Sequence, residues 1–204
     1  DAKDMDAFMA EPWDLDSSKT VKDALVEEVA VIGENLTIRR FEKVVAESGC
    51  VVSYTHGGGR IGVIVEADTT AVTDDVKEAL TNVAMQIAAL NPKYVSQADV
   101  SEEYKEHEKS ILLEQAKNDP KNAGKPDNII EKMIIGRLNK ELKEVCLLEQ
   151  EYVKAENKES VGKYLEAVSK AAGADVKIKR FVRFETGEGI EKKKEDFAAE
   201  VAAQ

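Results

Sequence analysis

Three consecutive glycines, residues 57–59, follow His56 in a stretch that reads YTHGGGRIGVIVE. Glycine-rich loops beside strands can hold phosphate, which makes nucleotide binding the first chemistry to consider. A P-loop, however, requires Lys and Ser or Thr after its last glycine, followed by a helix whose N-terminus faces the phosphate. Here Arg60–Glu66 follows, a β-branched run typical of a strand. Both a P-loop and a dinucleotide-binding fingerprint are therefore excluded.

The glycines instead favour a tight turn between antiparallel strands, because glycine adopts positive φ angles at little cost. Such a turn places His56 at the end of a strand. On residue chemistry alone, a histidine there is more often a polar loop-edge residue than a functional one.

No other group of residues has the spacing of a catalytic or metal site. The sequence contains no GxSxG, HExxH or CxxC, and its two cysteines, Cys50 and Cys146, cannot form a standard zinc site with two histidines. His107 lies in a wholly polar stretch typical of an exposed helix. We predict that the chain is not an enzyme and holds no cofactor or metal.

The composition points to a protein that binds other proteins. The chain has 204 residues, 43% hydrophobic and 34% charged, which suits one substantial domain with an appendage. Its net charge of -11 disfavours nucleic acid as the main ligand, although the strand-like run 177–184 alternates Phe with Arg. No apolar run is long enough to span a bilayer, and nothing suggests a disulfide framework, so a reducing compartment is the default.

Hydrophobic periodicity and turn residues predict an α+β chain with an antiparallel sheet of three to four strands packed with helices. A first helix begins at Ser17 or Ser18 and ends at Gly33. The other expected elements are strands at Thr37–Val45, Val51–His56, Arg60–Glu66 and Val176–Glu185, and helices at 74–90, 101–118 and 190–203.

Two narrow apolar stripes predict a projecting antiparallel coiled-coil hairpin. The alternative is two surface helices packed on a sheet, which we rank second because each stripe is narrower than an ordinary core-facing surface. The stripes are Ile130, Ile134, Leu138, Leu142 and Val145, then Val161, Leu165, Val168 and Ala172.

An internal repeat supports a duplicated unit. A shift of 140 residues aligns Val21–Phe41 with Val161–Phe181 without a gap. Both copies carry a helix pattern, a glycine stop and a basic strand pattern at the same spacing.

Several motifs, in order from about Ser18 onward, resemble the elongation factor Ts family. They are 32–41 (IGENLTIRRF), 53–63 (SYTHGGGRIGV), 124–126 (GKP) with 130–133 (IEKM) and 136–137 (GR), 147–150 (LLEQ), 181–192 (FVRFETGEGIEK) and 196–201 (DFAAEV).

The resemblance implies a guanine-nucleotide exchange factor that binds the GTPase elongation factor Tu and displaces GDP and Mg²⁺. It also implies a core of two similar subdomains, a coiled coil associated with self-association, and a C-terminal helix that docks on the GTPase. The implied partner-binding residues are His56, Gly57, Gly58, Gly59, Arg60, Ile61, Phe197 and Val201. We predict four divisions of the chain: an N-terminal segment with the first helix at 1–36, a core of 37–124 with 174–189, the helical hairpin 125–173 and the C-terminal helix 190–204.

The sequence departs from the family pattern in two ways. Neither the small ubiquitin-associated-type helical domain with which the family normally starts nor its Thr-Asp-Phe motif is found in the sequence, and Glu151 follows Gln150 where the family usually has proline. In the family that Asp-Phe pair wedges into the partner near Mg²⁺, so we expect slower exchange with docking retained. The second hypothesis is therefore a ribosome-associated or structural module that docks without exchanging nucleotide. Asp1 at the start leads us to expect a fragment or processed product. The resemblance implies that the protein works in the chloroplast stroma or the bacterial cytoplasm.

Overall fold

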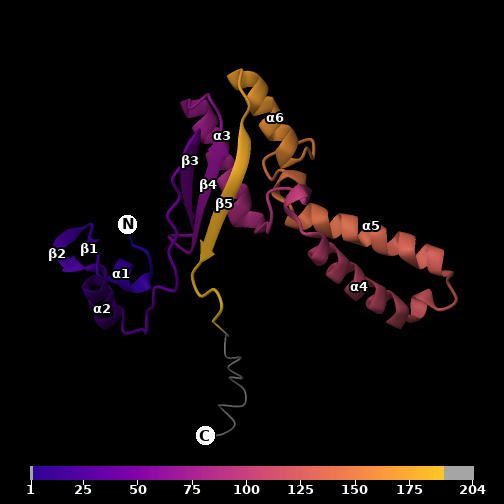
Figure 1. Cartoon of the computed structure of the whole chain (residues 1–204), viewed down its shortest axis with the longest axis horizontal. Coiled ribbons are helices and arrows are strands. Elements are labelled where there is room, and N and C mark those ends of the chain that lie inside the picture. Colours follow the sequence, from indigo (N-terminus) through magenta and orange to yellow (C-terminus); the bar gives the residue numbers. More distant parts are fainter. Residues whose placement is uncertain (1, 191–204) are drawn as a thin grey trace, which may run out of the picture. The chain divides into compact units, whose positions relative to one another are not determined.

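The structure is a computed structural model that describes residues 2–190 (Figure 1). The chain divides into two compact units, Asp1–Val44 and Val45–Gln204. Helices and antiparallel strands are mixed along it, which confirms the predicted α+β class. The predicted helix at 190–203, with Phe197 and Val201, lies outside the described residues.

The first unit begins with elements that the sequence did not predict. A short helix α1 (Met5–Met9) precedes a small antiparallel pair, β1 (Pro12–Trp13) and β2 (Asp16–Thr20), and then helix α2 (Val21–Ile32). The Phe8 ring of α1 stacks on Phe41 with 4.6 Å between ring centroids.

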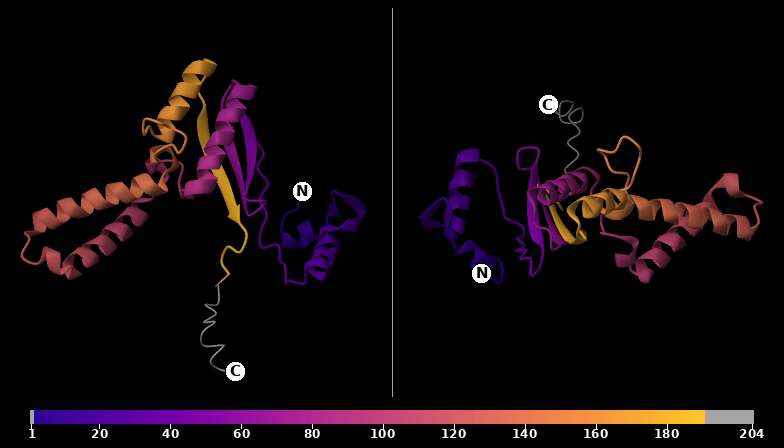
Figure 2. Two further views of the ribbon diagram at one scale, coloured as in Figure 1. Left: turned by 180° about the vertical axis from the view of Figure 1, so that it is seen from behind. Right: turned by 90° about the horizontal axis from the view of Figure 1, so that it is seen from above.

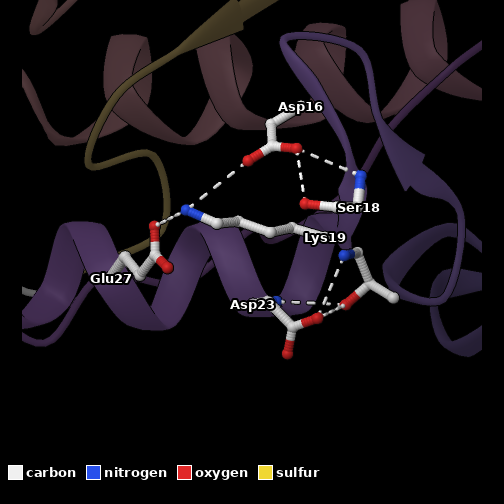
Figure 3. A network of polar contacts seen from close by, with 6 residues as sticks. Asp16, Ser18, Lys19, Asp23 and Glu27 are labelled. Atoms are coloured by element: carbon white, nitrogen blue, oxygen red, sulfur yellow. Dashed lines mark hydrogen bonds and ion pairs between the residues drawn. The ribbon is translucent and has the colours of Figure 1, made fainter.

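The N-cap of helix α2 is Thr20, so the predicted cap at Ser17 or Ser18 was wrong. The Thr20 hydroxyl accepts a hydrogen bond from Asp23 N, and the Asp23 carboxylate accepts one from Thr20 N at 3.0 Å. This reciprocal capping box satisfies two backbone donors that the first turn leaves unpaired. Lys19, between Asp16 and Glu27, joins strand to helix through a 2.7 Å ion pair with Glu27 (Figure 3).

The second unit is built on a three-stranded antiparallel sheet, β3 (Cys50–His56), β4 (Ile61–Asp68) and β5 (Lys177–Glu185), in the order β3-β4-β5. Helix α3 (Asp74–Leu90) lies across β3 and β4, as Figure 2 shows. Alternate residues of β4 face it because strand side chains alternate between the two faces. The core joins Val63, Val65 and Ala67 of the sheet to Val76, Leu80, Val83 and Ile87 of the helix.

The strand predicted at Thr37–Val45 is absent, which corrects the four-stranded alternative. Residues 35–46 have no regular secondary structure. A β-branched run gains strand geometry only when a neighbouring strand accepts its backbone hydrogen bonds, and neither sheet of the described residues extends to this segment.

The projecting helical pair consists of α4 (Glu102–Asn118) and α5 (Asp127–Val145), as Figure 1 shows. The predicted pairing of 128–145 with 161–172 was therefore wrong. Instead α6 (Val161–Ala172) packs with α3, and its Val161 and Leu165 belong to the sheet core. The alternative of a surface helix packed on a sheet holds for α6. Short 3₁₀ turns lie at Gln97–Asp99, Pro120–Asn122 and Leu147–Glu149.

The helix of the internal repeat forms in both copies, whereas its strand forms only in the second copy. Both α2 and α6 have 12 residues and end at a glycine with positive φ, Gly33 at 77° and Gly173 at 66°. Only the second copy continues into a paired strand, β5. Among the described residues, no helix combines the length and the apolar character that a membrane crossing requires.

Candidate partner-binding site

The glycine-rich stretch forms the tip of the β3–β4 hairpin. His56 pairs opposite Ile61, and the intervening residues 57–60 form an exposed turn. Gly57, Gly58 and Gly59 have φ angles of 61°, 66° and 96°. These angles lie in the region that favours glycine, so the three residues are the local reason for the turn. As the sequence predicted, strand β4 follows the glycines directly, and no helix begins immediately after them.

The tip is supported by the third strand. The Arg60 carbonyl accepts a hydrogen bond from Thr186 N at 2.9 Å, just beyond β5, where Glu185 pairs opposite Ile61. The backbone is therefore paired with a neighbouring strand at His56 and hydrogen-bonded beyond β5 at Arg60, so both ends of the turn are joined to the sheet.

The imidazole of His56 is exposed and lies within hydrogen-bond distance of a neighbouring side chain. Its Nδ1 lies 2.9 Å from the hydroxyl of Tyr54, two residues earlier on the same face of β3. The ring centroids are 5.9 Å apart. Tyr54 is half-buried and packs against the sheet core, so it links the exposed imidazole to the interior.

The C-terminal end of α3 lies over the same end of the sheet. Arg183 pairs opposite Val63, and its guanidinium donates to the Ala88 carbonyl of α3 at 3.4 Å. The same guanidinium forms a 2.9 Å ion pair with Glu185. Leu90, the last residue of α3, is 46% exposed. This end of the second unit therefore combines an imidazole, a guanidinium and an apolar side chain.

The two cysteines and His107 do not form a second candidate site within the described residues. Both cysteines are buried, and burial raises the pKa of the Cys50 thiol and raises that of Cys146 to about 11. A thiol with a raised pKa is a poor nucleophile at neutral pH. His107 is exposed on α4. Within residues 2–190, no group of three His, Cys, Asp or Glu side chains could hold a metal ion.

The structure brings His56, Arg60, Ile61 and the three glycines together, while Phe197 and Val201 fall outside the described residues. Sequence reasoning missed Tyr54. The spacing of Tyr54 and His56 within one strand is the signal that could have revealed it, since residues two apart share a face. An exposed turn that carries an imidazole hydrogen-bonded to Tyr54 suits recognition of another macromolecule better than covalent chemistry.

The family model described as Elongation factor TS matches residues 1–188. The chain belongs to the elongation factor Ts family. It is 52% identical over 188 residues to elongation factor Ts of Clostridium perfringens strain 13, covering 92% of this chain and 60% of that protein.

Other elongation factor Ts proteins give the same result. That of Clostridioides difficile strain 630 is 54% identical over 186 residues, with 91% of this chain and 59% of the relative covered. Elongation factor Ts of Clostridium botulinum strain Eklund 17B is 48% identical over 190 residues, with 93% of this chain and 61% of the relative covered. The chain thus spans about 60% of the length of these curated elongation factor Ts relatives.

Proposed function

We propose that this chain binds elongation factor Tu and promotes the replacement of GDP by GTP on that GTPase. The observation that carries the proposal is the elongation factor Ts family match across residues 1–188. The exposed hairpin tip, with His56 and Arg60 joined to the sheet by hydrogen bonds, supplies the docking surface. The nucleotide belongs to the partner, so this chain needs no phosphate-binding loop of its own.

The exchange activity follows from differential affinity. A factor that binds the nucleotide-free GTPase more tightly than the GDP-bound form must, by linkage, lower the affinity of that GTPase for GDP. Contacts that differ between the two states are the only source of this coupling. We propose that His56 makes one such contact with the GTPase domain.

Release of a fluorescent GDP analogue from elongation factor Tu tests this function. The chain should accelerate release, and His56→Ala should reduce the acceleration by roughly tenfold, the effect of one strong interface residue. His107→Ala is the matched control, because His107 is the other exposed histidine and lies on α4. A release rate that the wild-type chain does not change would refute the exchange function.

Docking without exchange is the second candidate. No Thr-Asp-Phe triplet occurs in residues 1–204, and a surface that binds both states of the GTPase equally produces no exchange. This candidate predicts an unchanged rate of GDP release in the same assay. A separate binding measurement should then show that the chain still binds elongation factor Tu.

Three narrower assignments belong to the same proposal. We place the protein in the bacterial cytoplasm, in preference to a chloroplast, since the relatives described above are bacterial. Self-association would use the α4–α5 pair, where Ile129 and Ile135 are exposed apolar residues. Phe197 and Val201 would contact the GTPase from the C-terminal segment.

A further inference from the structure

We propose that Tyr54 is a positioning residue that fixes the His56 ring through Nδ1, so that Nε2 carries the proton and donates to a hydrogen-bond acceptor on the partner. The inference rests on the proposed function, since it assigns a chemical role to the docking imidazole. The partner surface that fits is a carbonyl or carboxylate oxygen facing the hairpin tip.

The Tyr54 ring is well placed to act as an anchor. It packs against the buried core and pairs opposite Val63, a residue only 1% exposed. Its hydroxyl reaches the Nδ1 atom of His56 at 2.9 Å, a full-strength hydrogen-bond distance. An exposed imidazole without such a bond would sample several orientations, and binding would have to order it at a cost in affinity.

The chemistry of the two groups selects the direction of the bond. A neutral imidazole has one donor nitrogen and one acceptor nitrogen, and a hydrogen bond to one nitrogen decides which carries the proton. A phenol hydroxyl is a better donor than an imidazole N–H, and an unprotonated imidazole nitrogen is a better acceptor than a phenol oxygen. Tyr54 therefore donates to Nδ1, and Nε2–H of His56 becomes the donor directed to the partner.

Nitrogen-15 NMR of the histidine rings in the isolated chain tests the positioning directly. Neutral His56 should show an acceptor Nδ1 and a protonated Nε2, and Tyr54→Phe should convert this to a mixture of both tautomers. Tyr164→Phe is the matched control, since it removes a hydroxyl that contacts Asn82 at 3.3 Å and should leave the His56 signals unchanged. A mixed tautomer population in the wild-type chain would overturn the inference.

A double-mutant cycle for binding to elongation factor Tu supplies the second test. Tyr54→Phe should weaken binding about threefold to tenfold, the usual range for one hydrogen bond, and should have no further effect once His56 is alanine. If His56→Ala weakens binding and Tyr54→Phe does not, the positioning role alone is wrong. If His56→Ala has no effect, the docking role of His56 is wrong and this inference falls with it.

Discussion

At the scale of single residues, two glycines of one hairpin differ in their backbone requirement. Gly58 in the turn has a φ of 66°, whereas Gly62 in β4 has ordinary strand geometry, and an added Cβ at either would meet no atom within 4 Å. Gly58→Ala should therefore lower the free energy of unfolding by about 1 kcal/mol through backbone strain alone. Gly62→Ala should leave it unchanged or raise it by about 0.5 kcal/mol.

Urea unfolding of the two variants measures this difference. Because the sites share one hairpin and both are open to solvent, they differ chiefly in backbone φ. Equal losses of stability in both variants would show that the turn does not depend on positive φ.

Glu66 gives a prediction for pH dependence. Its carboxylate is 2% exposed and accepts a 2.7 Å hydrogen bond from Arg180, with Lys179 at 3.1 Å. These two partners hold the pKa of Glu66 below its ordinary value of 4.5. Because this pKa is lowered, the ionised Glu66 carboxylate contributes its full stabilisation of the fold above pH 4.5. That contribution is lost as the pH falls through the folded-state pKa.

Glu66→Gln should therefore unfold at lower urea concentration than the wild type at pH 7. The difference in unfolding midpoint between the two proteins should narrow as the pH falls below 4.5 and through the lowered folded-state pKa, where the wild-type carboxylate takes up its proton. Asp175→Asn is the control, since the Asp175–Lys177 pair is exposed and worth little. A gap that stays constant from pH 7 to pH 3 would contradict this account.

The residue-scale features were only partly predictable. The three glycines were enough to place His56 at a strand end, because their conformational freedom is intrinsic and local. The spacing of Tyr54 and His56 could have placed the two side chains on one face of the strand, but it could not predict their hydrogen bond, because it does not fix their rotamers.

At the scale of elements, the helical pair shows that sequence periodicity can predict a helix without predicting which other helix packs against it. The apolar stripe of α5 correctly predicted a helix that projects with a partner. It did not identify the partner, because a stripe describes one surface and carries no information about which other surface covers it. The actual partner, α4, is largely polar along Glu102–Ser110, so its contribution was overlooked.

Neighbouring residues of α5 allow a direct test of this pairing. Ile134 is 2% exposed and Ile135 is 45% exposed. Ile134→Ala should destabilise the α4–α5 pair by about 3 kcal/mol, as expected for a buried isoleucine. Hydrogen exchange should accelerate in residues 102–145, with β4 and α3 unaffected.

Ile135→Ala is the control and should leave exchange unchanged, since it removes little buried surface. If Ile134→Ala speeds exchange throughout β4 and α3 as well, the helical pair does not unfold as a separate element. If neither variant changes exchange, α5 does not depend on α4.

The missing strand at Thr37–Val45 has a related explanation. Strand pairing satisfies backbone donors and acceptors between segments, so β propensity in one segment is not sufficient. The two copies of the repeat illustrate this requirement. The segment Val176–Glu185 has the same pattern as Thr37–Val45, and it forms a strand because it pairs with β4.

At the scale of the whole molecule, the second unit combines a three-stranded sheet, a protruding turn and a helical pair, and the family match extends across residues 1–188. We propose that the hairpin tip recognises elongation factor Tu. On this proposal the three glycines shape the turn, and the imidazole of His56 makes the contact.

Titration calorimetry with purified elongation factor Tu tests that claim most directly. Three forms of this chain should be compared, the wild type, His56→Ala and His107→Ala. We predict that His56→Ala raises Kd about tenfold, which corresponds to about 1.4 kcal/mol, and that His107→Ala leaves Kd unchanged. A Kd for His56→Ala equal to that of the wild type would contradict the account.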